Sequence, residues 1–216
     1  MAKGTVVVDP GHGGTTSVGG SDANHAISTS GVLEKAMTLA MGLLVRDALM
    51  AANASGHQIT VVMTRTTDVN LGLVARANVA RDHNADVFLS IHYNGFDASA
   101  RGVETFVRPE ANGNVNLADD TAFAQRLQSR VFQAIKARDS GTKNRGVKEM
   151  KLGVLEDRAL GNTATRHRCR AALIEIEFID VAAVDQLLNT DPNAAAARAD
   201  VAKAIKDAIL EELVTL

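Results

Sequence analysis

Three side chains that commonly bind metal ions stand next to predicted buried elements of this sequence. His12 lies in a glycine-rich segment that follows an apolar run, His92 closes another apolar run, and Glu34 begins an amphipathic segment. A catalytic zinc ion commonly takes three protein ligands, histidine or carboxylate, and leaves a fourth position for water. Two histidines and one glutamate meet this demand, so these residues predict a catalytic zinc site and a hydrolytic reaction.

Each of these residues also has a purely structural interpretation. His12 could be a turn residue among glycines, Glu34 could complement a helix dipole, and His92 could be a hydrogen-bonded core residue. The glycine-rich segment could cradle a phosphate, but Thr16 stands where the dinucleotide fingerprint requires glycine. The metal hypothesis therefore rests on the three residues together.

A buried apolar segment toward the C-terminus contains two more carboxylates, Glu175 and Glu177. Alternate residues of a strand point to the same face. Carboxylates on a buried face are costly unless they are paired or bound to a metal ion, so at least one should be functional. Glu175 could take the proton of a zinc-activated water and pass it to a leaving amine, and Glu177 is a possible second carboxylate.

Length and composition predict a single catalytic α/β domain over residues 1–216. The net charge of -2 predicts no general affinity for nucleic acid. The single cysteine, Cys169, excludes an intramolecular disulfide and a cysteine-rich zinc cluster, so histidine and carboxylate must hold any metal. The first apolar run, residues 5–8, is too short to span a membrane or to form a signal peptide, and we expect a monomer.

Short β-branched apolar runs alternate with amphipathic segments along the chain. The predicted strands are Thr5–Val8, Ile59–Met63, Val87–Ile91, Val103–Val107 and Ala172–Phe178. Helices are predicted at 33–53, 71–84 and 121–136, followed by a last helix with Asp191 as N-cap and Pro192 in the first turn. This alternation predicts a three-layer α/β/α fold with a mostly parallel, twisted sheet. Ligands gather at the carboxyl ends of strands in such sheets, where the candidate residues stand.

The motifs of the chain, taken in order, resemble those of zinc-dependent N-acetylmuramoyl-L-alanine amidases, often called amidase type 3. The likeness runs from Val6 to about Asp180, and no single motif is decisive, but their common order is specific. Its segments are Val7–Gly14, Leu33–Lys35, Thr64–Asp68 with Arg76-Ala77, Ala85–Asn94, Asn144–Lys148 and Leu173–Glu175. The resemblance implies His12, Glu34 and His92 as Zn²⁺ ligands and Glu175 as the catalytic carboxylate. It also implies peptidoglycan as substrate, cut between N-acetylmuramic acid and L-alanine.

The sequence departs from the family pattern beside the implied catalytic carboxylate. The family usually has glycine at the position of Glu177 and often has asparagine at that of Asp180. A second carboxylate near Glu175 could raise its pKa, because two close like charges resist joint ionisation. The register of the motif favours Glu175 over Glu177 as the working carboxylate.

The groove around the zinc ion is expected to bind the substrate. Arg65 and Arg145 are candidates to meet carboxylates of the stem peptide, and Asn94 is a candidate to form a hydrogen bond with the substrate. Arg76 is a further candidate. The same arginines could instead form structural ion pairs, with Asp68 among others, and Asn94 could merely orient its loop.

Two other functions fit the same residues. The motifs specify the metal and the water more than the sugar, so a zinc peptidase or amidase of this fold could act on another substrate. A non-catalytic wall-binding module would need a lost ligand or base, and all four positions are present. An enzyme of the bacterial cell wall would act in the periplasm or outside the cell. The lack of a visible signal peptide suits a phage endolysin made in the cytoplasm or a trimmed secreted autolysin domain.

Overall fold

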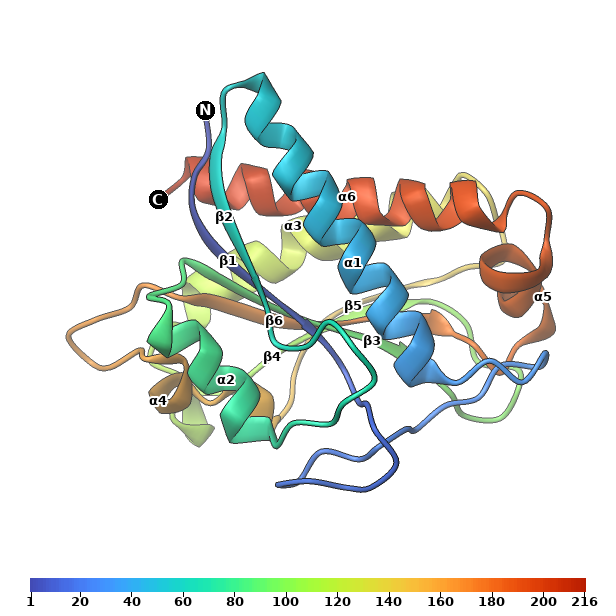
Figure 1. The fold of residues 1–216 in the computed structure, drawn as a ribbon, viewed down its shortest axis with the longest axis horizontal. Coiled ribbons are helices and arrows are strands. Elements are labelled where there is room, and N and C mark those ends of the chain that lie inside the picture. The colour runs from blue at the N-terminus through green and yellow to red at the C-terminus, as the bar shows by residue number, and fades with distance from the viewer.

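One six-stranded sheet forms the centre of the molecule in a computed structural model that describes all 216 residues (Figure 1). The strand order is β2-β1-β3-β6-β4-β5. β1, β2, β3 and β6 run parallel, whereas β4 pairs antiparallel with β6 and parallel with β5. The predicted α/β fold with a mostly parallel sheet is confirmed. The strands are β1 (Lys3–Pro10), β2 (Gln58–Met63), β3 (Val87–Asn94), β4 (Val103–Val107), β5 (Asn144–Glu149) and β6 (Arg170–Phe178).

The edge strand β5 is absent from the sequence prediction. It has no apolar run, and most of its residues are exposed or half-buried, so its pattern is not that of a buried strand. Because β4 and β5 run against β6, their first residues lie at the edge where β1, β3 and β6 end. That edge therefore collects side chains from five strands.

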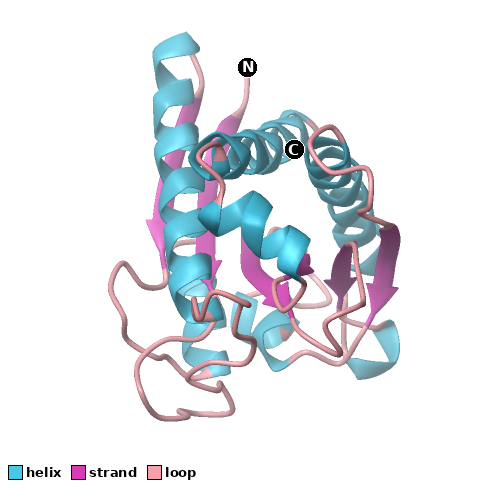
Figure 2. Ribbon diagram, turned by 90° about the vertical axis from the view of Figure 1, so that its right-hand side faces the viewer, coloured by secondary structure: helices cyan, strands magenta, loops and turns pink.

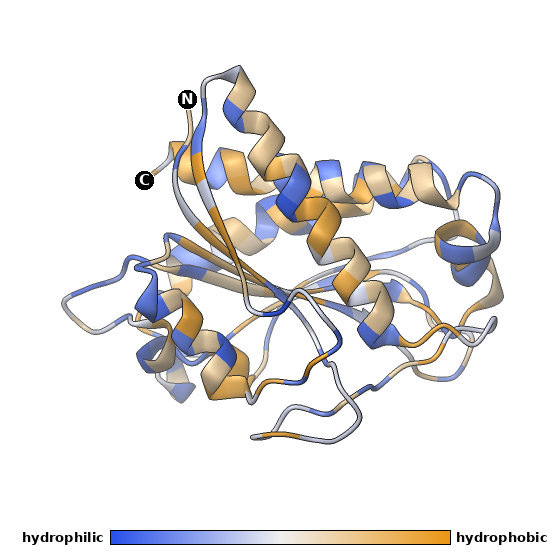
Figure 3. Cartoon of the chain, in the orientation of Figure 1, coloured by the Kyte–Doolittle hydropathy of each residue, from blue (hydrophilic) through white to orange (hydrophobic).

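Helices cover both faces of the sheet. On one face lie α1 (Glu34–Ala52), α3 (Leu117–Lys136) and α6 (Ala194–Val214), which bury a core of 34 residues against alternate strand positions such as Val6, Val8 and Leu89. On the other face, α2 (Leu73–Asp82) and the short α4 (Asp157–Leu160) pack on positions such as Val7 and Leu173. Figure 2 shows the helices around the sheet and long loops gathered at one end of the molecule, and Figure 3 shows hydrophilic residues on the helices as well as in the loops.

The starts of α6 and α3 differ clearly from the sequence prediction, whereas the bounds of α1 and α2 agree with it to within two residues. α6 begins at Ala194, with Asn193 rather than Asp191 at the N-cap position. The Asp191 carboxylate instead accepts a hydrogen bond from the backbone N–H of Asn193 (2.7 Å), so Asp191 and Pro192 form the turn that leads into the helix. α3 begins at Leu117, four residues before the predicted start at Thr121. No helix is both long enough and apolar enough to cross a bilayer.

Candidate metal centre and substrate groove

The structure brings His12, Glu34 and His92 together. Nε2 of His12 lies 3.2 Å from Oε1 of Glu34, and Nδ1 of His92 lies 3.1 Å from the same oxygen. One ligand atom from each side chain lies within 4.8 Å of the other two. Residues that are 22 and 58 positions apart in the chain thus present three donor atoms to one point.

His12 lies two residues beyond the end of β1, in a loop rather than at the strand end. Its φ is 59°, a left-handed conformation that is uncommon for residues other than glycine. The conformation is held because Arg76 donates a hydrogen bond to the carbonyl of His12 (2.7 Å). Nδ1 of His12 is 2.9 Å from the carbonyl oxygen of Asp22. A carbonyl can only accept, so Nδ1 carries a proton, and Nε2, the nitrogen that faces Glu34, is the one available as a ligand atom.

The glycines around His12 are required by close packing. A Cβ on Gly11 would lie 2.2 Å from the imidazole ring of His92, and one on Gly13 would lie 2.0 Å from the carbonyl oxygen of Val69. Real Cβ contacts are never so short. The glycine-rich segment therefore lets the backbone pass directly against the second histidine, as a close approach requires.

Glu34 is the first residue of α1 and is 1% exposed. Its Oε2 accepts a hydrogen bond from the N–H of Ala26 (3.0 Å), and its Oε1 accepts one from the N–H of Tyr93 (3.1 Å). Burial opposes ionisation, but the hydrogen bonds with His12 and His92 outweigh it and lower the pKa of Glu34. Glu34 is thus a fixed, ionised carboxylate at neutral pH.

Arg65 and Arg76 hold the frame of this cluster and are too buried to meet a substrate, with exposures of 3% and 1%. Arg65 donates to four backbone carbonyls, among them that of Pro10. Arg76 forms an ion pair with Asp9 (2.9 Å) and also donates to the carbonyl of His12. Of the two interpretations open for these arginines, the structure supports the structural one. The substrate-binding role expected for Arg65 is not retained.

The donor set fits a metal ion. Two imidazoles and one carboxylate are the ligands of many catalytic zinc sites, and such sites hold the outer atoms of their ligands by hydrogen bonds. Here the outer nitrogen of His12 and the outer oxygen of Glu34 are both bonded to backbone groups. A cavity of about 210 Å³ adjoins the cluster on the α2 face and is lined in part by His12, His92 and Leu173.

Glu175 lies directly beside His92, since the two residues are partners in the pairing of β6 with β3. Its Oε2 is buried and has no hydrogen-bond partner. Burial, together with the charges of Glu34 and Glu104, raises the pKa of Glu175 well above its ordinary value. Glu175 therefore places a proton-accepting or proton-donating oxygen next to the metal cluster.

Glu177, the possible second carboxylate, is fully buried and committed to other contacts. Its oxygens accept hydrogen bonds from the N–H groups of Gly102 (2.8 Å) and Phe178 (2.9 Å) and from the hydroxyl of Thr142 (2.6 Å). Nε of Arg101 lies 3.6 Å away. The carboxylate anchors the start of β4 to β6, which accounts for a carboxylate where the family usually has glycine.

Glu104 is a site residue that the sequence prediction missed. It lies directly opposite Glu175 in the antiparallel pairing of β4 with β6. Its carboxylate accepts hydrogen bonds from Nδ2 of Asn94 (2.6 Å), Nε of Arg145 (2.8 Å) and Nζ of Lys148. A carboxylate within the apolar run Val103–Val107 was the available signal, the same one that drew attention to Glu175. Asn94 and Arg145 thus belong to one network at the edge of the site.

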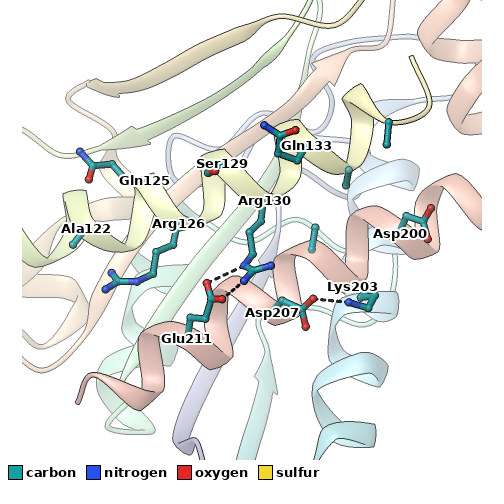
Figure 4. A pocket seen from close by; sticks show the side chains of 13 residues that line it. Ala122, Gln125, Arg126, Ser129, Arg130, Gln133, Asp200, Lys203, Asp207 and Glu211 are labelled. Carbon is teal, nitrogen blue, oxygen red and sulfur yellow. Dashed lines mark hydrogen bonds and ion pairs between the residues drawn. The ribbon is translucent and has the colours of Figure 1, made fainter. Parts of the chain in front are cut away.

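The remaining histidines do not join the cluster. His25, His83 and His167 are exposed, and half-buried His57 accepts a hydrogen bond from the N–H of Ala2 (3.0 Å). The molecule has a larger hollow of about 850 Å³, but it lies between α3 and α6 (Figure 4). Its charges are paired, within the hollow in Arg130–Glu211 and Lys203–Asp207 and with residues outside it for Arg126 and Asp200, and it contains none of the candidate residues.

Comparison with known proteins agrees with the motifs. The profile of the family described as N-acetylmuramoyl-L-alanine amidase matches residues 6–210. The amidase CwlM of Bacillus licheniformis is 30% identical over 138 residues, 64% of this chain and 47% of that protein. The endolysin of Bacillus phage SPP1 is 30% identical over 164 residues, 75% of this chain and 53% of that protein. The chain thus spans about half the length of these relatives.

A solved structure matches over nearly the whole length of both chains. The N-acetylmuramoyl-L-alanine amidase from Clostridium difficile 630 superposes with a TM-score of 0.77 at 27% identity, covering 100% of this chain and 99% of that one.

Proposed function

The chain belongs to the N-acetylmuramoyl-L-alanine amidase family, and from this premise we propose that it hydrolyses the amide bond between N-acetylmuramic acid and L-alanine in peptidoglycan. The observation that supports the proposal is the convergence of three metal-binding side chains beside a half-buried carboxylate, Glu175, whose buried Oε2 has no hydrogen-bond partner. In this proposal the protein acts on the bacterial cell wall.

We propose that His12, Glu34 and His92 hold Zn²⁺. When bound, the ion supplies Lewis acidity, which polarises a substrate carbonyl and lowers the pKa of water. Asp22 fixes the tautomer of His12, and the backbone N–H of Ala26 fixes the carboxylate of Glu34. These contacts orient two of the three donors before any ligand binds.

Glu175 is proposed as the group that moves the proton. Its partnerless Oε2 accepts a proton from the attacking water, and the resulting carboxylic acid gives that proton to the nitrogen of the departing L-alanine amine. Its raised pKa suits this shuttle, because the protonated form must last long enough to serve as the acid.

Arg145 is proposed to bind a carboxylate of the stem peptide. Only its Nε is hydrogen-bonded, to Glu104, so both terminal amino groups remain for a substrate, and the side chain is 36% exposed. A carboxylate can accept two parallel hydrogen bonds from such a guanidinium. Asn94 lies in the same network, and its amide oxygen is proposed to accept a hydrogen bond from the substrate.

The test is incubation of the purified protein with purified peptidoglycan. The expected products are stem peptides with a free L-alanine amine, and their release should stop with a chelator and return when Zn²⁺ is added. Glu175→Gln should lower kcat about 10²- to 10⁴-fold, the usual contribution of a general acid–base, without reducing the bound metal.

The products also distinguish the proposed amidase reaction from two other reactions. New reducing sugar ends would identify a glycosidase, and new peptide amines from within the stem would identify a peptidase. Undiminished release in the presence of a chelator that has removed all metal would exclude a metal-dependent reaction.

A further inference from the structure

Phe96 is the one aromatic side chain that is largely exposed, with 80% of its surface accessible. The chain has six phenylalanines, one tyrosine and no tryptophan, and the others are buried or half-buried. Phe96 lies four residues after His92, in the loop that leaves the site end of β3. An apolar ring in water next to a substrate site is a candidate contact for the substrate.

The loop that carries Phe96 is firmly held. The carboxylate of Asp180, just beyond β6, accepts hydrogen bonds from the N–H groups of Phe96 and Ala98, both at 2.9 Å. Ala98 has a φ of 60°, a left-handed conformation that persists only where the surroundings impose it. The far end of the loop is tied down by the hydrogen bond from Gly102 to Glu177. The exposure of Phe96 is therefore a fixed feature of the loop.

A second apolar side chain is presented by the adjoining loop. Gly95 packs on Ala26 so closely that a Cβ at Gly95 would lie 2.8 Å from the Cβ of Ala26. The next residue, Ile27, is 53% exposed, and the N–H of Ala26 holds the carboxylate of Glu34. Figure 1 shows both loops at the right-hand edge of the molecule, near the N-terminal end of α1. Phe96 and Ile27 thus lie on adjoining loops that lead directly to the segments carrying His92 and Glu34.

We propose that Phe96, assisted by Ile27, binds the glycan strand of the substrate by packing against the apolar C–H face of a sugar ring. This inference rests on the proposed amidase function. The scissile amide has a neutral sugar on one side and a charged peptide on the other. The exposed cationic groups of the site belong to Arg145 and Lys148, which share Glu104 as a partner and lie on β5, across β6 and β4 from β3. The border at Phe96 has apolar surface and the carboxylates of Asp97 and Asp180, which would repel a carboxylate of the peptide, so this border is left for the sugar.

The test measures how two competitive inhibitors slow the cleavage of intact peptidoglycan. The inhibitors are glycan strands stripped of their stem peptides, and free stem peptides. For Phe96→Ala we expect the inhibition constant of stripped glycan to rise about tenfold, the effect of roughly 1.4 kcal/mol of lost contact. Inhibition by free stem peptide should be unchanged. Phe96→Tyr should restore inhibition by stripped glycan. Arg145→Gln should weaken inhibition by free stem peptide and leave inhibition by stripped glycan unchanged.

Met50→Ala is the matched control, because Met50 is 55% exposed in α1 and lies near the end of that helix remote from Glu34. It should change neither inhibition constant. The inference is overturned if stripped glycan does not inhibit the wild-type protein, or if Phe96→Ala leaves glycan inhibition unchanged. It is also overturned if Phe96→Ala weakens inhibition by both probes equally. Failure of the wild-type protein to release stem peptides would instead refute the proposed amidase function.

Discussion

Asp9, which is fully buried, and Glu175, which is half-buried, are two carboxylates near the ends of parallel strands, and their surroundings are opposite. Asp9 is paired with Arg76 (2.9 Å) and accepts hydroxyl hydrogen bonds from Thr64 (2.6 Å) and Ser90 (2.7 Å). Burial opposes its ionisation, but Arg76 and the hydroxyls lower the pKa of Asp9. Glu175 has no arginine or lysine partner, and burial with two neighbouring carboxylates raises its pKa. The paired charge supports the frame, whereas the unpaired one is available for proton transfer.

The largest expected effect comes from breaking the paired charge. Arg76→Met leaves Asp9 buried without a cation, so we expect a loss of about 3–5 kcal/mol in the free energy of unfolding, measured by denaturant titration. The control is Arg145→Met, which removes a half-exposed guanidinium and should cost about 1 kcal/mol or less. Equal losses for the two variants would show that burial and pairing do not distinguish these arginines.

Asp120 tests whether an unpaired buried carboxylate needs to be catalytic. It lies at the other end of β6, where it accepts hydrogen bonds from Ala171 N–H and Asn114 Nδ2. Burial, with the charge of Asp157, raises the pKa of Asp120 from 3.8 to about 7. Between these values the folded protein keeps a proton that the unfolded chain releases. Asp120 therefore contributes stability at low pH that is lost as the pH rises toward 7.

The expected slope from Asp120 is at most about 1.4 kcal/mol per pH unit. Asp120→Asn should flatten the fall of the melting temperature between pH 4 and about pH 7 and leave the rate of peptidoglycan cleavage unchanged. An unchanged pH profile of melting would show that Asp120 titrates normally in the folded protein.

Glu177 gives the smallest and most specific contrast with Glu175. Glu177→Gln weakens the contacts with Gly102, Thr142 and Phe178, so we expect a loss of about 1–3 kcal/mol in unfolding free energy. Because these contacts face β4 and its preceding loop, kcat should stay within a few-fold of the wild-type value. Thr142→Val, which removes one of the same hydrogen bonds, is the control. A fall in kcat comparable to that of Glu175→Gln would show that Glu177 also takes part in the chemistry and that its assignment as a structural residue is wrong.

Most of the fold could be predicted because its elements have strong patterns. The apolar runs around Val6, Leu89 and Ile174 are buried on both faces of the sheet, and each run is a strand in the structure. The motifs around His12, Glu34 and His92 likewise lie at the ends of such elements. Local pattern was enough wherever burial left little freedom in residue type.

The other side of the groove depends on contacts that local patterns do not contain. β5 is an exposed edge strand, and the reversal of β4 is a property of the chain path between strands. Without them, nothing places Arg145 and Lys148 beside Glu104. Similarly, Arg65 and Arg145 look alike as residue types, and only burial separates the first as a structural group from the second as an available one.

The glycines around His12 explain why one side of the groove can be recognised in a sequence at all. At Gly11 and Gly13 an added methyl group would collide with His92 or with backbone, so of twenty residue types only one fits. A segment in which so few residue types fit is easy to recognise in a sequence, even though glycine itself performs no chemistry. Around Arg145 the residues of β5 are exposed or half-buried, so packing restricts the residue type much less. The glycine-rich motif of this chain therefore reflects the packing around its candidate metal ligands, whereas residues of β4 and β5 that contact a substrate could change without altering that motif.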